Sequence, residues 1–185
     1  INKIYYNNAA PSQSHILSIQ GSSGKSSYYI SFGYDHKDGI MKVRPDKLDK
    51  YNATVNVTSS LYDWLQVGAR FNYTRRDYER PDTYNNVYQY LWRWGSFFIP
   101  SGTLGGYDTR VLAQLKQAAL EKTATDFTRM NAFLKANILE GLTFNADFTY
   151  AIQNMNSGSQ DFSVYGINWL HANPTYIVEK EATSV

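Results

Sequence analysis

Six segments of the chain alternate between apolar and polar residues with a period of two. In residues 27–36, for example, Tyr28, Ile30, Phe32 and Tyr34 alternate with residues that are mostly small or polar. A period of two places successive side chains on opposite faces of a β-strand. The pattern therefore predicts strands with one apolar, aromatic face and one polar face. Such strands are expected near residues 13–20, 27–36, 50–58, 65–74, 129–138 and 142–153.

The connections between these segments alternate in length. Short connections at 21–26, 59–64 and 139–141 alternate along the chain with longer links at 37–50, at 75–128 and after Asn154. An up-and-down barrel of a bacterial outer membrane has short periplasmic turns and long extracellular loops. We therefore expect an all-β fold, an antiparallel up-and-down transmembrane β-barrel segment, with Gly21, Tyr62 and Gly141 at its periplasmic end.

The longest link, at 75–128, is expected to be an extracellular loop that holds a short helix. Asp108 and Thr109 are suited to cap that helix, because their side-chain oxygens can accept hydrogen bonds from its first amides. An apolar stripe follows at helical spacing, made of Val111, Leu112, Leu115, Ala118 and Ala119. A loop of this length in a compact domain is either functional or folded on itself.

Composition excludes several other classes of protein. The 185 residues include 16 Tyr, 9 Phe and 4 Trp, yet the mean hydropathy is −0.47. No stretch approaches the roughly 18 apolar residues that a spanning helix requires. The absence of cysteine rules out disulfides and thiolate metal sites. The net charge of +2 is scattered along the chain, so nucleic acid is not an expected partner.

Aromatic residues gather at the start of the long loop, at Tyr84, Tyr88, Tyr90, Trp92, Trp94, Phe97 and Phe98. Three interpretations are open: the rings contact substrate, they bind a partner protein, or they pack the loop on itself. Aromatic rings can stack on the apolar faces of sugars, and Trp and Tyr dominate the energetics of protein interfaces. Packing of the loop on itself is the favoured interpretation.

The aromatic residues of the strands have an ordinary explanation in a membrane. Tyr28, Tyr34, Tyr51, Tyr73 and Tyr150 are suited to the aromatic girdles found at bilayer interfaces. On the opposite, inward face, Arg70, Lys135 and Asp147 form a charged row, and Phe133 alone breaks the alternation. The charged row either lines a substrate path or faces a plug domain or solvent; the second interpretation is favoured.

No catalytic, metal or cofactor site is expected. The three histidines, His15, His36 and His171, lie far apart in the sequence, and no nucleophile-elbow or zinc-protease motif occurs. The acidic pairs Asp46 with Asp49 and Asp77 with Glu79 have the oxygen ligands that calcium prefers. Charges of a solvated loop are the favoured interpretation of both pairs.

Three stretches resemble the SusC/RagA family of TonB-dependent transporters, and they do so in the family's order. The first is LSIQG (17–21) with SYYISFGY (27–34) and DGI (38–40); the second is KYNATVNV (50–57) with DWLQVGA (63–69); the third is EGLTF (140–144). The resemblance covers roughly 12–75 and 129–153. It implies a barrel of about 22 strands with a plugged lumen. It also implies a place in the bacterial outer membrane, TonB-driven import of oligosaccharides or peptides, and a SusD-like lipoprotein acting as a lid.

Six strands are too few for a closed barrel, whose smallest outer-membrane form has about eight. We therefore expect residues 1–185 to belong to a longer polypeptide or to pair with further strands, with the plug and the TonB-contacting segment outside this chain. On this interpretation lipid covers the apolar face. The rival interpretation is a soluble carbohydrate-binding β-sandwich, in which that face would be buried against a second sheet.

Overall fold

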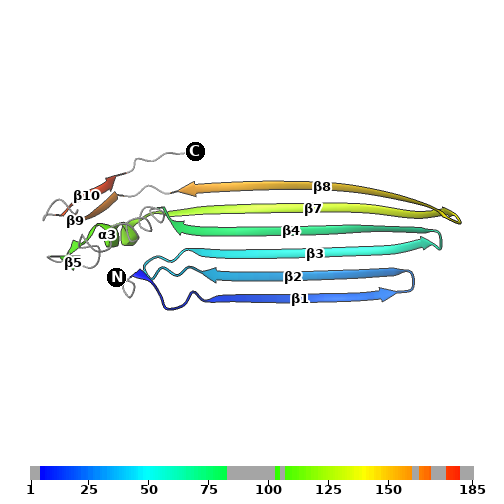
Figure 1. The fold of residues 1–185 in the computed structure, drawn as a ribbon, viewed down its shortest axis with the longest axis horizontal. Helices are drawn as coiled ribbons and strands as arrows, with labels where there is room; N and C mark the ends of the chain where they lie inside the picture. The colour runs from blue at the N-terminus through cyan, green and yellow to red at the C-terminus, as the bar shows by residue number, and fades with distance from the viewer. Residues whose placement is uncertain (1–4, 83–102, 105–106, 160–162, 168–173, 180–185) are drawn as a thin grey trace.

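A computed structural model describes residues 5–82, 103–104, 107–159, 163–167 and 174–179 of the chain. Its main element is one antiparallel sheet in which the strands follow the order β1-β2-β3-β4-β7-β8 (Figure 1). These strands are β1 (Ser12–Ser23), β2 (Ser26–Asp38), β3 (Lys47–Tyr62), β4 (Leu65–Pro81), β7 (Leu120–Leu139) and β8 (Leu142–Ser159). The prediction of antiparallel up-and-down strands is confirmed. The sheet is open, with β1 and β8 as its edges.

Each predicted strand lies within an observed strand, but the observed strands are longer. The connection between β4 and β7 is shorter than the predicted loop at 75–128, because β4 continues to Pro81 and β7 already begins at Leu120. Charged pairs hold this extension together: Arg80 bonds Glu121 at 2.9 Å, and Lys122 lies 3.2 Å from Glu79. The apolar alternation stops before these residues, so the sequence pattern did not detect them.

Three two-residue turns join the strands into hairpins, and all lie at one end of the sheet (Figure 1). They are Gly24-Lys25, Asp63-Trp64 and Glu140-Gly141. Gly24 and Gly141 have φ of 56° and 84°, a left-handed backbone that glycine adopts without steric cost. Each turn falls within one of the three predicted short connections. We call this end of the sheet the turn end, and the opposite end the loop end.

The loop end holds the short elements of the chain. These are β5 (Thr103–Leu104), β6 (Tyr107–Asp108), α3 (Arg110–Gln117), β9 (Ser163–Ile167) and β10 (Pro174–Glu179). The predicted helix is confirmed as α3. Thr109 occupies its N-cap position, but its side chain makes no capping hydrogen bond. Among the described residues, no helix combines the length and apolarity needed to cross a membrane.

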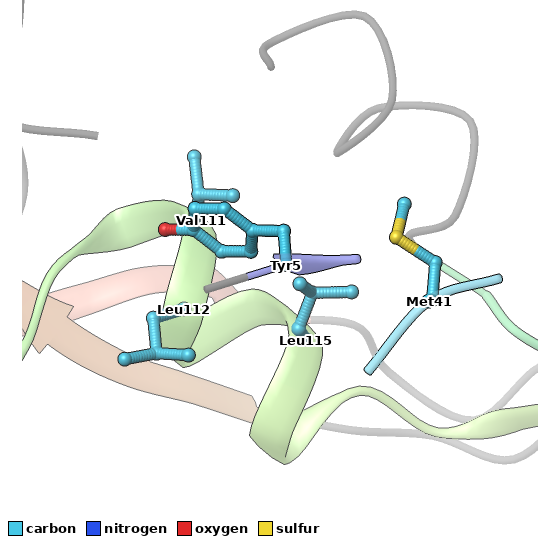
Figure 2. Packing of buried hydrophobic residues seen from close by; sticks show 5 residues of the cluster. All are labelled: Tyr5, Met41, Val111, Leu112 and Leu115. Atoms are coloured by element: carbon cyan, nitrogen blue, oxygen red, sulfur yellow. The ribbon is translucent and has the colours of Figure 1, made fainter. Parts of the chain in front are cut away.

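A small hydrophobic core lies at the loop end, and we call it the loop-end cluster. It consists of Tyr5, Met41, Val111, Leu112 and Leu115 (Figure 2). The backbone amide of Lys42 donates to the carbonyl oxygen of Tyr5 at 2.8 Å, so the N-terminal segment is fastened to the β2–β3 link. Helix α3 thus packs on two segments that are distant in sequence.

Helix α3 is also fastened to β9. The Gln117 side chain donates to the carbonyl oxygen of Tyr165 at 2.7 Å and accepts from its amide at 2.8 Å. One side chain therefore satisfies both polar groups of a strand residue.

Burial raises the pKa of Tyr5 to about 12, while a hydrogen bond with Thr109 acts in the opposite direction. The loop-end cluster therefore keeps its full stability below a pH of about 10, the ordinary tyrosine value, and loses this contribution as the pH rises toward 12.

Candidate functional site

The strand register gathers the apolar residues of all six strands on one face of the sheet. Residues that pair directly across antiparallel strands lie on the same face. One register row crosses the whole sheet and is apolar or aromatic throughout: Ile19, Ile30, Val55, Phe71, Met130 and Tyr150. The alternation predicted from sequence is thus realised as a continuous apolar face.

No layer of the described chain covers this apolar face. Phe32 is 57% exposed, Leu17 66% and Phe148 69%. The two other described sheets, β5-β6 and β9-β10, lie at the loop end (Figure 1). Soluble monomers rarely expose contiguous apolar patches larger than a few hundred Å². The apolar face therefore requires a covering that the described residues do not supply.

Toward the loop end, tyrosines mark the limit of the apolar face. The Tyr34 hydroxyl donates to Asp49 at 2.7 Å, and the Tyr73 hydroxyl donates to Asp126 at 2.5 Å. Beyond them the same face is charged, as where Arg75 bridges Asp77 at 3.0 Å. The Tyr34 ring lies 5.2 Å from the Tyr51 ring and 6.4 Å from the His15 ring between centroids, so aromatic rings gather where the apolar face gives way to the charged zone. Membrane proteins place tyrosine in this way at the boundary between lipid and water.

Aromatic residues also occupy the turn end. The rings of Tyr62 and Trp64 stack with centroids 5.7 Å apart, and the two side chains are 58% and 51% exposed. Tyr62 is the last residue of β3 and pairs with Leu65, and Trp64 belongs to the turn between them. The apolar face thus lies between two aromatic borders.

The three turns are offset along the strands by a regular step. Ser26, the first residue of β2, pairs with Ser59, which pairs with Val67 on β4. Because β4 begins at Leu65, it extends two residues further toward the turn end than β2 does. Leu65 pairs with Ala136, which pairs with Phe144 on β8. Because β8 begins at Leu142, it extends another two residues toward the turn end. Two residues for every two strands is one residue per strand. With a rise of about 3.4 Å per residue and strands about 4.8 Å apart, this offset corresponds to a strand tilt of about 35° if the turns lie in one plane.

Tyrosines repeat the same offset at the other border. Tyr34, Tyr73 and Tyr150 each lie eight residues after the first residue of their strand, which is Ser26, Leu65 or Leu142 respectively. Eight residues at about 3.4 Å, tilted by about 35°, span a height of about 22 Å. Transmembrane barrels have strands tilted by about 35–45° and an apolar band about 25 Å tall. Tilt and height therefore both fit a membrane-spanning wall.

Hydrogen bonds link the residues of the polar face across the strands. Ser14 donates to Asp35 at 2.6 Å, Asn52 donates to the same carboxylate at 3.5 Å, and Thr74 donates to Asn52 at 3.1 Å. This chain of bonds runs from β1 to β4. A network of this kind suits a wet surface rather than a packed apolar interior.

The predicted inward residues all lie on this polar face. The Arg70 guanidinium lies over the Phe133 ring, 4.8 Å from its centroid, and Asp147 accepts from Asn131 at 3.5 Å. Lys135 shares the face through its pairing with Gln66.

Phe133, the one exception to the alternation, covers a glycine. A Cβ at Gly68 would stand 2.3 Å from the Phe133 ring, so only glycine leaves room for that ring. An aromatic ring over a strand glycine compensates for the missing side chain. The combination of Gly68, Phe133 and Arg70 is therefore a local packing unit of the polar face.

The four acidic residues considered for calcium each have a protein partner. Asp46 accepts from Tyr78 at 3.3 Å, Asp49 contacts His36 at 2.8 Å, and Asp77 and Glu79 bridge Arg75 and Lys122 respectively. In the described ranges, no three acidic or histidine side chains are placed to hold a metal ion.

The predicted aromatic site, Tyr88, Tyr90, Trp92, Trp94, Phe97 and Phe98 with Tyr84, lies outside the described residues.

Comparison of the chain with protein-family models, with curated proteins and with solved structures finds no match.

Proposed function

We propose that this chain is a barrel-wall segment of an outer-membrane transporter. The observation that carries the proposal is the uncovered apolar face, which ends at tyrosines on one side and at an aromatic turn on the other. Lipid tails cover this face, and the polar face turns toward the interior of the barrel. The loop end faces the outside of the cell, since outer-membrane barrels have their short turns in the periplasm.

The open edges of the sheet determine what else the wall requires. Hydrocarbon offers no hydrogen bonds to a backbone, so every strand that spans it must be paired on both sides. β1 and β8 each have one unpaired edge within the described sheet. Further strands must therefore continue the wall on both sides. In a barrel of about 22 strands, these six form roughly a quarter of the wall.

The resemblance to the SusC/RagA family suggests what passes through this wall. On that basis the transporter imports oligosaccharides or peptides with energy derived from TonB, and a SusD-like lipoprotein closes it from outside. Packed structure at the loop end is consistent with this arrangement, because α3 contacts β9 through Ala113 and Val164 at the end of the sheet that we place outside the cell. The aromatic run 84–98 follows β4 in the sequence. Packing of the loop on itself is the favoured prediction for its rings, and contact with substrate and contact with the lid are the two others.

The soluble carbohydrate-binding β-sandwich fits the described geometry less well. A sandwich buries the inner faces of two sheets against each other at a separation of about 10 Å. The described chain places nothing against Phe32 or Phe148, which stay more than half exposed. The fold of a sandwich also gives no physical reason for tyrosines at a constant distance from the starts of three strands.

Membrane fractionation of the cells that produce the protein tests the proposed function. We expect it to sediment with membranes, to remain there after a wash with alkaline carbonate, and to require detergent for extraction. A protein held only by surface charges would be released by the wash, because exposed ion pairs are weak. Recovery of the protein in the soluble fraction without detergent would favour the sandwich and contradict the proposal.

A further inference from the structure

Charges on the six long strands are segregated by face. Apart from the bridged pair Arg80 and Glu121, the polar face carries six cations and two acids, Asp35 and Asp147. The cations are Lys37, Lys50, Arg70, Arg76, Arg129 and Lys135. The opposite face carries three cations and five acids, all in the zone beyond the tyrosines. The inward side of the wall is therefore strongly positive, while the outward side leans negative.

The cations of the polar face are also unpaired. Within the described part of the chain, none of the six forms a salt bridge, and the Arg70 guanidinium contacts the Phe133 ring. The two acids of this face are engaged by neutral side chains, Asp35 by Ser14 and Asp147 by Asn131. On the other face, Arg75 and Lys122 are both bridged to acids. The polar face thus has spare positive charge that its own residues do not neutralise.

Two of these cations flank an exposed aromatic ring. On β7, Phe127 and Arg129 are successive residues of the polar face, and Phe127 is 38% exposed. Phe127 pairs with Thr74 on β4, so Arg76 is its diagonal neighbour, at about 7–8 Å between Cα atoms. Lys50 lies directly opposite Arg76 on the next strand. The ring is therefore bordered by guanidinium groups on both sides along the strand direction.

This combination suits one chemical class of solute. A guanidinium binds carboxylate or sulfate through two parallel hydrogen bonds, and an aromatic ring offers a flat apolar surface to a sugar. A channel lined by one sign of charge also concentrates the opposite sign, because low-dielectric walls focus the field. Neutral sugars could accept hydrogen bonds from these cations but would gain no charge pairing with them.

We propose that the polar face selects anionic oligosaccharides, which carry carboxylate or sulfate groups, with Arg76, Phe127 and Arg129 as the central contacts. This inference rests on the proposed function, because it requires the polar face to line the path of the solute. The other possible occupant of the face is an acidic surface of a plug domain. Solute is the better fit, since the central contacts include an exposed ring as well as charge.

A matched pair of sugars tests the inference. The probes are a hexamer of galacturonic acid and the same hexamer with every carboxylate methyl-esterified, which keeps the length and removes the charge. The protein is extracted in detergent from the cells that produce it, with all the strands that complete its barrel, and binding is measured by calorimetry. We expect the acid to bind at least about tenfold more tightly than the ester at low salt, with the difference shrinking at high salt.

Two double variants assign the effect to one face of the sheet. Arg76→Gln with Arg129→Gln should weaken binding of the acid by at least about tenfold and leave the ester unchanged. Arg75→Gln with Lys122→Gln, which alters the outward face of the same two strands, should leave both affinities unchanged. Equal affinity for acid and ester, or no binding of either, would overturn the inference.

The remaining outcomes separate this inference from the proposed function. If the protein is an integral membrane protein but the Arg76 and Arg129 variant binds the acid as well as the parent does, only the inference fails. A lower melting temperature in that variant, with unchanged binding, would assign the two arginines to a plug and would also overturn it. A protein that is soluble without detergent fails the proposed function itself, whatever sugar it binds.

Discussion

If lipid covers the apolar face as we propose, replacing Ala146 by Arg will lower the free energy of unfolding by about 2–4 kcal/mol, the cost of an arginine that faces lipid near the bilayer centre. Ala146 is exposed on the apolar face of β8, midway between Leu142 and Tyr150. Alanine is small, so the substitution removes almost no packing. The expected loss therefore reports on the medium outside the sheet rather than on contacts within it.

The neighbouring residue provides the control. Asn145→Arg introduces the same side chain one residue earlier, on the polar face beside Lys135. We expect it to cost no more than about 1 kcal/mol, because the site is exposed and the like charge of Lys135 opposite it is only mildly unfavourable. Both variants would be unfolded by urea from lipid vesicles and followed by circular dichroism. If Ala146→Arg were as mild as Asn145→Arg, the apolar face would be in water and the membrane interpretation would be wrong.

Leu115→Ala has the second large expected effect, a local one. Leu115 is fully buried in the loop-end cluster, against Tyr5 and Met41 (Figure 2). Removing its side chain should cost about 2–5 kcal/mol of the stability of that cluster, through lost transfer energy and the cavity left behind. Amide hydrogen exchange in α3 should accelerate accordingly, while exchange in the centre of β3 stays as it is. The cluster lies beyond the tyrosine border, so the part of the sheet between the tyrosines and the turn end does not depend on it.

Lys116→Ala is the matched control on the same helix. Lys116 is about half exposed and bridges Asp108 at 2.9 Å, a surface pair worth at most about 1 kcal/mol. Its loss should leave α3 protected. Unchanged protection of α3 in the Leu115→Ala variant would show that the cluster does not hold the loop end together.

The faces of the sheet could be predicted from sequence because they depend on a local period. Tyr28, Ile30 and Phe32 share a face in any extended strand, whatever lies beside it. The helix could be predicted for the same reason, since Val111, Leu112 and Leu115 recur at helical spacing. Their partners could not be predicted in this way. Nothing near Tyr5 indicates that it packs on α3, more than a hundred residues later.

The charged ends of β4 and β7 could not be predicted as strands, because they lack the alternation of apolar and polar residues that indicates a strand in sequence. β4 and β7 extend through Glu79, Arg80 and Glu121 by pairing opposite charges across strands, which no single-strand pattern reveals. One further signal was present in the sequence. Tyr34, Tyr73 and Tyr150 stand at equal distances from their strand starts, but the spacing has meaning only once the turns are located. The aromatic site predicted at 84–98 stays a prediction.

The segregation of charge also depended on register. Arg75 and Arg76 are adjacent in the sequence, yet one bridges Asp77 on the outward face and the other lies unpaired on the polar face. The net charge of +2 conceals this difference. Alternation assigns each residue to a face, and the observed contacts show which cations are already neutralised.

Spin labels along β8 test most directly whether lipid covers the apolar face. Residues 1–185 contain no cysteine, so a single cysteine introduced at each of residues 143–150 in turn is the one labelling site within this segment. In lipid vesicles, labels at Phe144, Ala146 and Phe148 should collide mainly with oxygen, which concentrates in hydrocarbon, and labels at the odd-numbered residues between them mainly with a water-soluble nickel complex. Equal access of the nickel complex to both sets, or shielding of the even-numbered set from both reagents, would contradict the account.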